Sequence, residues 1–298
     1  MTSEQILPYV RLDRDGETWR FYRRLGDEQV MPPKTSHATI TICYQARLFR
    51  IIQDNLNLYC GKQGRISAYK VLEVYRRYLD WRESLPPVIA NISESDQPLP
   101  HILQLHVQYH TALVQLFRPL VHGSFFLDSD GAEMRRIVVF HARSGVEPIG
   151  HAQRLYSARY LLPLVTFCLV HLCDTLLSYS PQEPPASETM AFCLQALQQN
   201  HAGFAVCSPL QSLFVQRAEE CGVRIPQHLE KLVDSIDNSS MDEILDACTR
   251  LTYMEPLDQI VQYIDPSIAT EWNEEWEIQI IGRKRRREPL QIGNILND

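Results

Sequence analysis

The chain lacks the short motifs by which nucleotide-binding and nucleophilic enzymes are recognised. It contains no GxGxxG and no GxxxxGK[ST] segment, the glycine-rich loops that hold nucleotide phosphates. It also lacks the GxSxG turn that presents a catalytic serine. Cys207 has no basic or histidine neighbour closer in sequence than His201, so no nearby residue favours its thiolate. We therefore find no residues for an enzymatic mechanism and predict that the chain is not an enzyme.

Cysteine pairs and an export signal are missing as well. The eight cysteines are scattered and show no CxxC spacing, which argues against a disulfide framework and against a cysteine zinc motif. The first residues are too polar for the apolar core of a signal peptide. The most apolar run, 160–177, contains Pro163, His171 and Asp174, whereas a bilayer span needs about 20 mostly apolar residues. We expect an intracellular chain with reduced thiols and no membrane contact, in which this run is a buried core helix.

The charge is unevenly distributed. The net charge is −7, which disfavours DNA binding through bulk electrostatics. One compact cluster departs from this acidic character, and it consists of Arg283, Lys284, Arg285, Arg286 and Arg287. Such a cluster is typical of segments bound by a nuclear import receptor and, less specifically, of segments that contact nucleic-acid phosphates. A solvated charge run is the alternative.

Apolar residues recur at helical spacing along most of the chain. Two stripes are especially regular, and they are formed by Val71, Val74, Tyr78, Trp81 and Leu85 and by Ile102, Leu105, Tyr109, Ala112 and Leu116. Proline follows each stripe, at Pro86 and Pro119, and is expected to end the helix. A third helix is expected to begin at Ser208 as N-cap and to end at Gly222.

Strand signals are confined to the short run 136–140, "RIVVF". The sequence therefore predicts an all-α fold, a multi-helix domain of orthogonal or solenoid-like arrangement. We divide it into an N-terminal extended segment at 1–35, a helical body at 36–265 and a tail at 266–298. The tail interleaves tryptophans with glutamates before the basic cluster. This mixture is typical of segments that contact coactivators, and an amphipathic helix packed on the body explains it equally well.

His106 and His110 stand four residues apart, the spacing that presents two imidazoles on one helix face to a metal ion. The glutamate that follows the first histidine in a zinc protease helix is absent, and no third ligand stands at a recognisable spacing. A structural role is the better interpretation. We expect no bound metal and no other cofactor.

Two neighbouring segments, "YLDWRESLPP" and "LQLHVQYHTALVQLFRP", resemble the fungal-specific transcription factor domain, the middle homology region of zinc binuclear cluster regulators. The resemblance extends over roughly residues 17–225. The residues that carry it are Trp81, Leu85 and Pro86 in the first segment and His106, Tyr109, Arg118 and Pro119 in the second. By this resemblance the seven residues form a structural signature of the fold, and His106 belongs to that signature.

The resemblance implies a nuclear regulator of transcription that controls a metabolic or secondary-metabolite pathway. Its helical domain would respond to a small-molecule effector or to a partner, either a coactivator or a second subunit in a homodimer or heterodimer. The cysteine cluster that holds zinc in this family has no counterpart here, since the first cysteines, Cys43 and Cys60, are isolated. We therefore expect no sequence-specific DNA binding by this chain alone. The alternative is a free-standing small-molecule-binding or biosynthetic protein, such as a cyclase or isomerase, derived from that domain.

Overall fold

A computed structural model describes residues 16–19, 33–60, 65–93, 97–123, 125–126, 128–156, 163–179, 186–201, 204, 206–223 and 257–282. Helices dominate these residues, and the two strands are only two residues long, β1 (Thr18–Trp19) and β2 (Lys34–Thr35), paired antiparallel. The prediction of an all-α fold is confirmed for this part of the chain.

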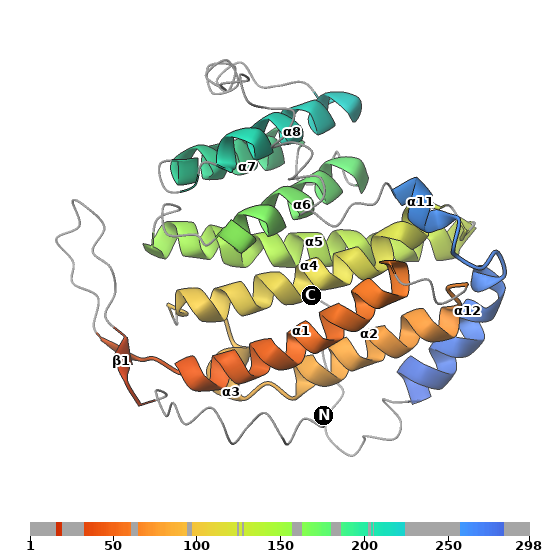
Figure 1. The fold of residues 1–298 in the computed structure, drawn as a ribbon, viewed down its shortest axis with the longest axis horizontal. Coiled ribbons are helices and arrows are strands. Elements are labelled where there is room, and N and C mark those ends of the chain that lie inside the picture. Colours follow the sequence, from red (N-terminus) through yellow and green to blue (C-terminus); the bar gives the residue numbers. More distant parts are fainter. Residues whose placement is uncertain are drawn as a thin grey trace.

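The helices follow one another as α1 (Ala38–Cys60), α2 (Ala68–Glu83), α3 (Pro87–Ala90), α4 (Pro100–His122), α5 (Asp128–Tyr156), α6 (Pro163–Tyr179), α7 (Ala186–His201), α8 (Cys207–Glu220), α11 (Leu257–Val261) and α12 (Ile268–Trp276), with the π-helix η5 (Glu277–Ile281) directly after α12. Figure 1 shows α1 and α2 at one side, then α4, α5 and α6 in successive layers, and α7 and α8 at the opposite side. The long helix α4 contacts α1, α2, α5, α6 and α11, so it is the centre of the stack. The layers follow the chain order, as in a solenoid.

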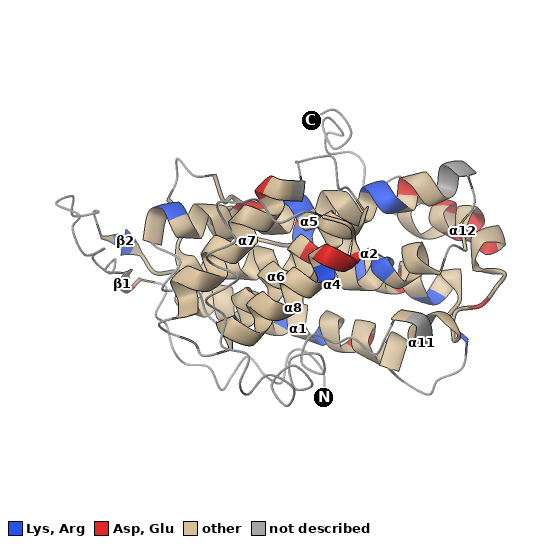
Figure 2. Cartoon of the chain, turned by 90° about the horizontal axis from the view of Figure 1, so that it is seen from above, with Lys and Arg blue, Asp and Glu red and all other residues tan. Residues whose placement is uncertain are grey.

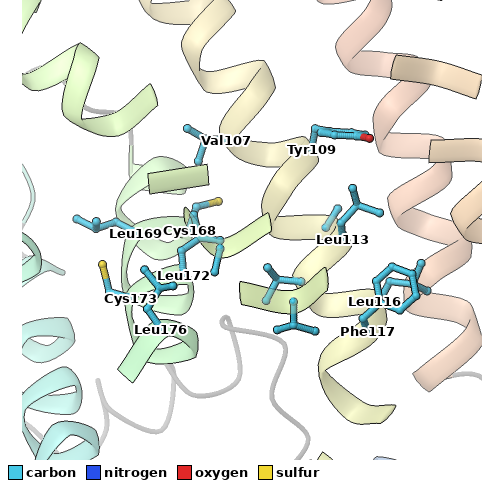
Figure 3. Close-up of a cluster of buried hydrophobic side chains, with 14 of the residues drawn as sticks. Val107, Tyr109, Leu113, Leu116, Phe117, Cys168, Leu169, Leu172, Cys173 and Leu176 are labelled. Atoms are coloured by element: carbon cyan, nitrogen blue, oxygen red, sulfur yellow. The ribbon is translucent and has the colours of Figure 1, made fainter. Parts of the chain in front are cut away.

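The core is built from the predicted apolar stripes. All ten stripe residues on α2, α4 and the turn after α2 are buried. Figure 3 shows part of this core, with Leu113, Leu116 and Phe117 of α4 and Leu169 and Leu172 of the neighbouring helix α6 among the buried side chains. The run 160–177 supplies most of α6, where nearly every residue from Val165 to Leu177 is buried, as predicted for a core helix. Among the described helices, none is both long enough and apolar enough to traverse a bilayer.

Two local expectations are corrected. Pro119 does not end α4, which continues to His122, because a proline removes only one N–H bond and Gly123 N still donates to Pro119 O at 3.0 Å. Ser208 is not an N-cap, since α8 already begins at Cys207 and backbone turns precede it. The run 136–140, which carried the strand signals, lies inside α5, so the all-α prediction is confirmed there. The predicted end at Gly222 is confirmed by its φ of 73° and by the bond from Val223 N to Ala218 O.

Candidate functional site

The first group of signature residues joins the end of α2 to α1 and α4. Trp81 is 4% exposed, and its indole Nε1 donates to the Tyr44 carbonyl oxygen of α1 at 3.0 Å. Its ring stacks on Tyr109 of α4, with centroids 5.2 Å apart. Leu85 is buried, and Pro86 stands at the N-cap of α3. The structure thus brings Trp81 and Tyr109 together across two helices.

His106 ties α4 to α3. Its Nε2 donates to the Ile89 carbonyl oxygen at 2.8 Å, and the side chain is buried. Burial lowers the pKa of His106 to about 4, and the Arg82 charge acts in the same direction. The imidazole is therefore neutral at pH 7, with its Nε2 proton committed to a backbone oxygen.

His110 turns to a different helix. Its Nδ1 lies 3.1 Å from Nδ1 of His141 on α5. Burial lowers the pKa of both imidazoles, to about 4 for His141, and the mutual repulsion of the two rings lowers the pKa of His110 further. Within the described ranges, no group of three or more histidine, cysteine or acidic side chains could hold a metal ion.

We predict that purified protein contains well under one zinc ion per chain. The Nε2 proton of His106 is already used by Ile89, and His110 is engaged with His141, so the two histidines offer no shared site. Elemental analysis after dialysis measures the stoichiometry. One firmly bound zinc per chain would contradict the structural interpretation of this pair.

The remaining signature arginine forms a buried ion pair. Nη2 of Arg118 on α4 lies 2.5 Å from Oδ2 of Asp174 on α6, and Nε of Arg217 on α8 lies 3.3 Å from Oδ1. Burial alone would raise the pKa of the Asp174 carboxyl, but the two guanidinium groups outweigh it and hold that pKa below its usual value. One carboxylate therefore joins three helices. The sequence hinted at this, because a lone aspartate in an apolar helix needs a partner, but it did not indicate which arginine.

A small cavity adjoins this ion pair. It has a volume of about 40 Å³, and its lining includes Asn55, Arg118 and His171. Each of these has a buried polar atom with no hydrogen-bond partner among the described residues, namely Asn55 Oδ1, Arg118 Nε and His171 Nε2. Two donors and one acceptor around such a space are suited to bound water. Sequence analysis did not identify this cavity.

We predict that the protein loses stability as the pH falls from 6.5 towards 4. Burial lowers the pKa of His106 and His141 to about 4 and that of His171 to about 3, whereas an unfolded histidine titrates near 6.5. The unfolded state therefore binds protons first, and each such histidine lowers the free energy of unfolding by up to about 1.4 kcal/mol per pH unit. Above pH 6.5 these histidines are neutral in both states, so they no longer lower the free energy of unfolding.

Urea unfolding at several pH values measures this slope. His141→Leu should make the slope shallower by about one proton. A free energy of unfolding that is constant or rises on acidification would contradict the prediction.

The C-terminal segment packs on the body through its tryptophans. Trp272 is 6% exposed and lies against Phe126 with ring centroids 5.2 Å apart, while Trp276 stacks on Tyr75 of α2 at 5.8 Å. Glu271 and Glu274 of α12 are exposed, and Figure 2 shows the acidic residues along this helix. Of the two interpretations of this segment, the structure shows the packed amphipathic helix, in which Trp272 is part of the core and Trp276 packs against it. The basic cluster 283–287 lies outside the described residues.

Two of the described cysteines, Cys168 and Cys207, have buried thiols. Burial raises the pKa of the Cys207 thiol, and likewise that of Cys168, to about 11. Both are therefore protonated at pH 7 and are poor nucleophiles. The described thiols are free cysteines without disulfides.

The fold and these contacts define a layered helical domain held by a buried ion pair and by aromatic and histidine contacts between helices. The chain is similar to the nitrogen assimilation transcription factor nit-4 of Neurospora crassa, with 25% identity over 180 residues. The match takes in 57% of the present chain and 16% of that protein, so the chain spans only a small part of its relative. No family model matches the chain, and no solved structure matches it. The similarity to a fungal transcription factor agrees with the resemblance carried by the signature residues.

Proposed function

We propose that the chain is the helical regulatory part of a fungal transcription regulator. The observation that carries the proposal is the similarity over 180 residues to a fungal transcription factor. The packing of the signature residues supports it, because Trp81, His106, Tyr109 and Arg118 all join α4 to neighbouring helices. An acidic net charge of −7 fits a domain that acts through partners and leaves DNA contact to a separate DNA reader.

Metabolic genes are the targets that we propose. The similar protein is a factor of nitrogen assimilation, which is a metabolic process. We also propose that the chain belongs to the zinc binuclear cluster family, and this proposal rests on the signature residues alone.

A reporter assay in a fungal host tests the proposal. The chain is fused to a heterologous DNA-binding domain, and a reporter with measurable basal expression is placed behind its operator. We expect expression to rise or fall at least severalfold relative to the DNA-binding domain alone, because activation and repression are both regulatory outcomes. Arg118→Ala, which breaks the buried ion pair, should abolish the effect, whereas Arg136→Ala on the surface should preserve it. Expression equal to that of the DNA-binding domain alone would refute the proposal.

The basic cluster leads to a separate prediction about localisation. Adjacent cations repel one another, so the clustering of five basic residues is better explained by binding to a partner with dense negative charge than by exposure to solvent alone. Binding to DNA through about five phosphate contacts would be weak and strongly salt-dependent, with a log-log slope of about −4 to −5. We propose a nuclear import receptor as the partner of Arg283–Arg287. Changing Lys284, Arg285, Arg286 and Arg287 to alanine in a fluorescent fusion should shift the protein from the nucleus to the cytoplasm.

The matched control removes four exposed arginines elsewhere, Arg47, Arg50, Arg135 and Arg136. This variant has lost the same number of cations and should remain nuclear. Circular dichroism should show unchanged helix content in both variants. The import proposal fails if the cluster variant stays nuclear at wild-type levels, or if the parent never enters the nucleus.

A further inference from the structure

A cavity of about 310 Å³ opens between α1, α4 and α6. Phe49 of α1 and Leu164 of α6 form part of its lining and are 43% and 40% exposed, so they lie at its mouth. Gln108 and Ala112 of α4 are 3% and 1% exposed and form its floor. Pockets for small molecules usually measure about 300–1,000 Å³, so this one suits a small ligand.

The floor of the cavity presents a buried amide with one end unpaired. Gln45 Nε2 donates to Gln108 Oε1 at 2.9 Å, which leaves Nε2 as the other end of the Gln108 amide. This Nε2 is inaccessible to solvent and has no hydrogen-bond partner among the described residues. A buried donor without an acceptor destabilises the folded protein, so each such group in a native structure calls for an explanation.

The rest of the lining indicates which ligand would supply the acceptor. Among the described residues that line the cavity, none has a charged side chain. Its other polar members are amides and the Thr111 hydroxyl, which already donates to the Val107 carbonyl oxygen at 2.8 Å. A charged ligand would be buried here without a counter-charge, at a high desolvation cost. The lining therefore favours an uncharged molecule with an apolar body.

We infer that this cavity binds a small uncharged molecule, largely apolar, whose carbonyl oxygen accepts a hydrogen bond from Gln108 Nε2. Because this atom is sealed from solvent in the structure, the Gln108 amide has to turn towards the cavity to make the bond. Binding itself does not depend on the proposed role in transcription. A role of the cavity as the effector site of a regulator does rest on that proposed function. A negative reporter result would refute the role in transcription but not the binding of a ligand. A failure to bind the probe would refute the binding site but not the role in transcription.

Fluorescence titration of the full chain tests the inference with Prodan, an uncharged naphthalene dye that carries one ketone and whose emission shifts to the blue in an apolar site. The matched probe is dimethylaminonaphthalene, which has the same ring system without the ketone. We expect saturable binding of one Prodan per chain and weaker binding of the ketone-free probe. Gln108→Leu should lower the affinity for Prodan about tenfold, the contribution of one good hydrogen bond, and should change that of the ketone-free probe little.

Two further variants locate the site. Leu164→Trp narrows the mouth at an exposed position, where a larger ring is tolerated, and should weaken both probes. Phe140→Ala removes a 59% exposed apolar side chain on α5, outside the cavity lining, and should change neither. Gln108→Leu removes a buried unpaired donor and also the acceptor for Gln45 Nε2, so the two effects on stability oppose each other and its melting temperature should stay close to that of the wild type.

The inference is overturned if Prodan shows no saturable binding, or if Leu164→Trp binds it as the wild type does. It is also overturned if Gln108→Leu keeps wild-type affinity for Prodan, because the amide would then not contact the ketone. A lower melting temperature of Gln108→Leu with equal loss of both probes would assign Gln108 a purely structural role and would likewise overturn it.

Discussion

Replacing Arg118 with alanine is expected to reduce the free energy of unfolding by about 3–5 kcal/mol, the usual effect of removing one partner of a buried ion pair. Asp174 is buried and would lose the guanidinium that lies 2.5 Å from its Oδ2. Arg217 would remain 3.3 Å from Oδ1, but its side chain is 40% exposed, so water weakens its interaction with Asp174. Urea unfolding followed by circular dichroism measures the loss.

Two companion variants identify the cause. Arg118→Met combined with Asp174→Leu removes both charges and should recover much of the lost stability, because no unpaired charge remains in the core. Arg136→Ala breaks an exposed pair with Glu133 and should change the free energy of unfolding by at most about 0.5 kcal/mol. If Arg118→Ala matches Arg136→Ala, the ion pair does not stabilise the α4–α6 contact.

Trp81→Ala is expected to cost a similar amount, about 3–5 kcal/mol, because it removes a large buried ring and leaves a cavity. The ring is 4% exposed, stacks on Tyr109 and anchors α1 through its bond to the Tyr44 carbonyl oxygen. Thermal and urea unfolding should both show the loss. A wild-type melting temperature would mean that α2 does not pack as the structure has it.

Trp81→Phe separates the contribution of apolar packing from that of the hydrogen bond made by the indole N–H. It keeps most of the apolar contact but loses the N–H donor, so a loss of about 1 kcal/mol is expected. Tyr69→Ala is the matched control on α2, since this aromatic side chain is 52% exposed and its removal should have little effect. An equal loss for Tyr69→Ala and Trp81→Ala would contradict the role of burial, because alanine is the best helix former and neither substitution lowers stability through helix propensity.

The sequence by itself determined the helices and their buried faces. Helical spacing is a local property, because residues three and four apart lie on one side of a helix wherever that helix docks. The stripe on α2 that contains Trp81 and the stripe on α4 that contains Tyr109 could therefore be predicted without knowing their neighbours. The end of α8 at Gly222 followed from equally local chemistry, since glycine adopts a positive φ without strain. The predicted end of α4 at Pro119 was wrong, because a proline disfavours a helix but does not exclude one more turn after it.

Only the tertiary structure decided the polar contacts. Arg118 and Asp174 stand 56 positions apart, and no spacing in the chain joins them. Their pairing depends on how α4 docks on α6, which is set by the shape of many apolar side chains at once. Likewise the four-residue spacing of His106 and His110 predicts one shared helix face. In the packed structure, however, the imidazole of His106 contacts α3 and that of His110 contacts α5. The unpaired amide of Gln108 follows from the same docking, because the cavity at its side exists only where α1, α4 and α6 fail to fill the space between them.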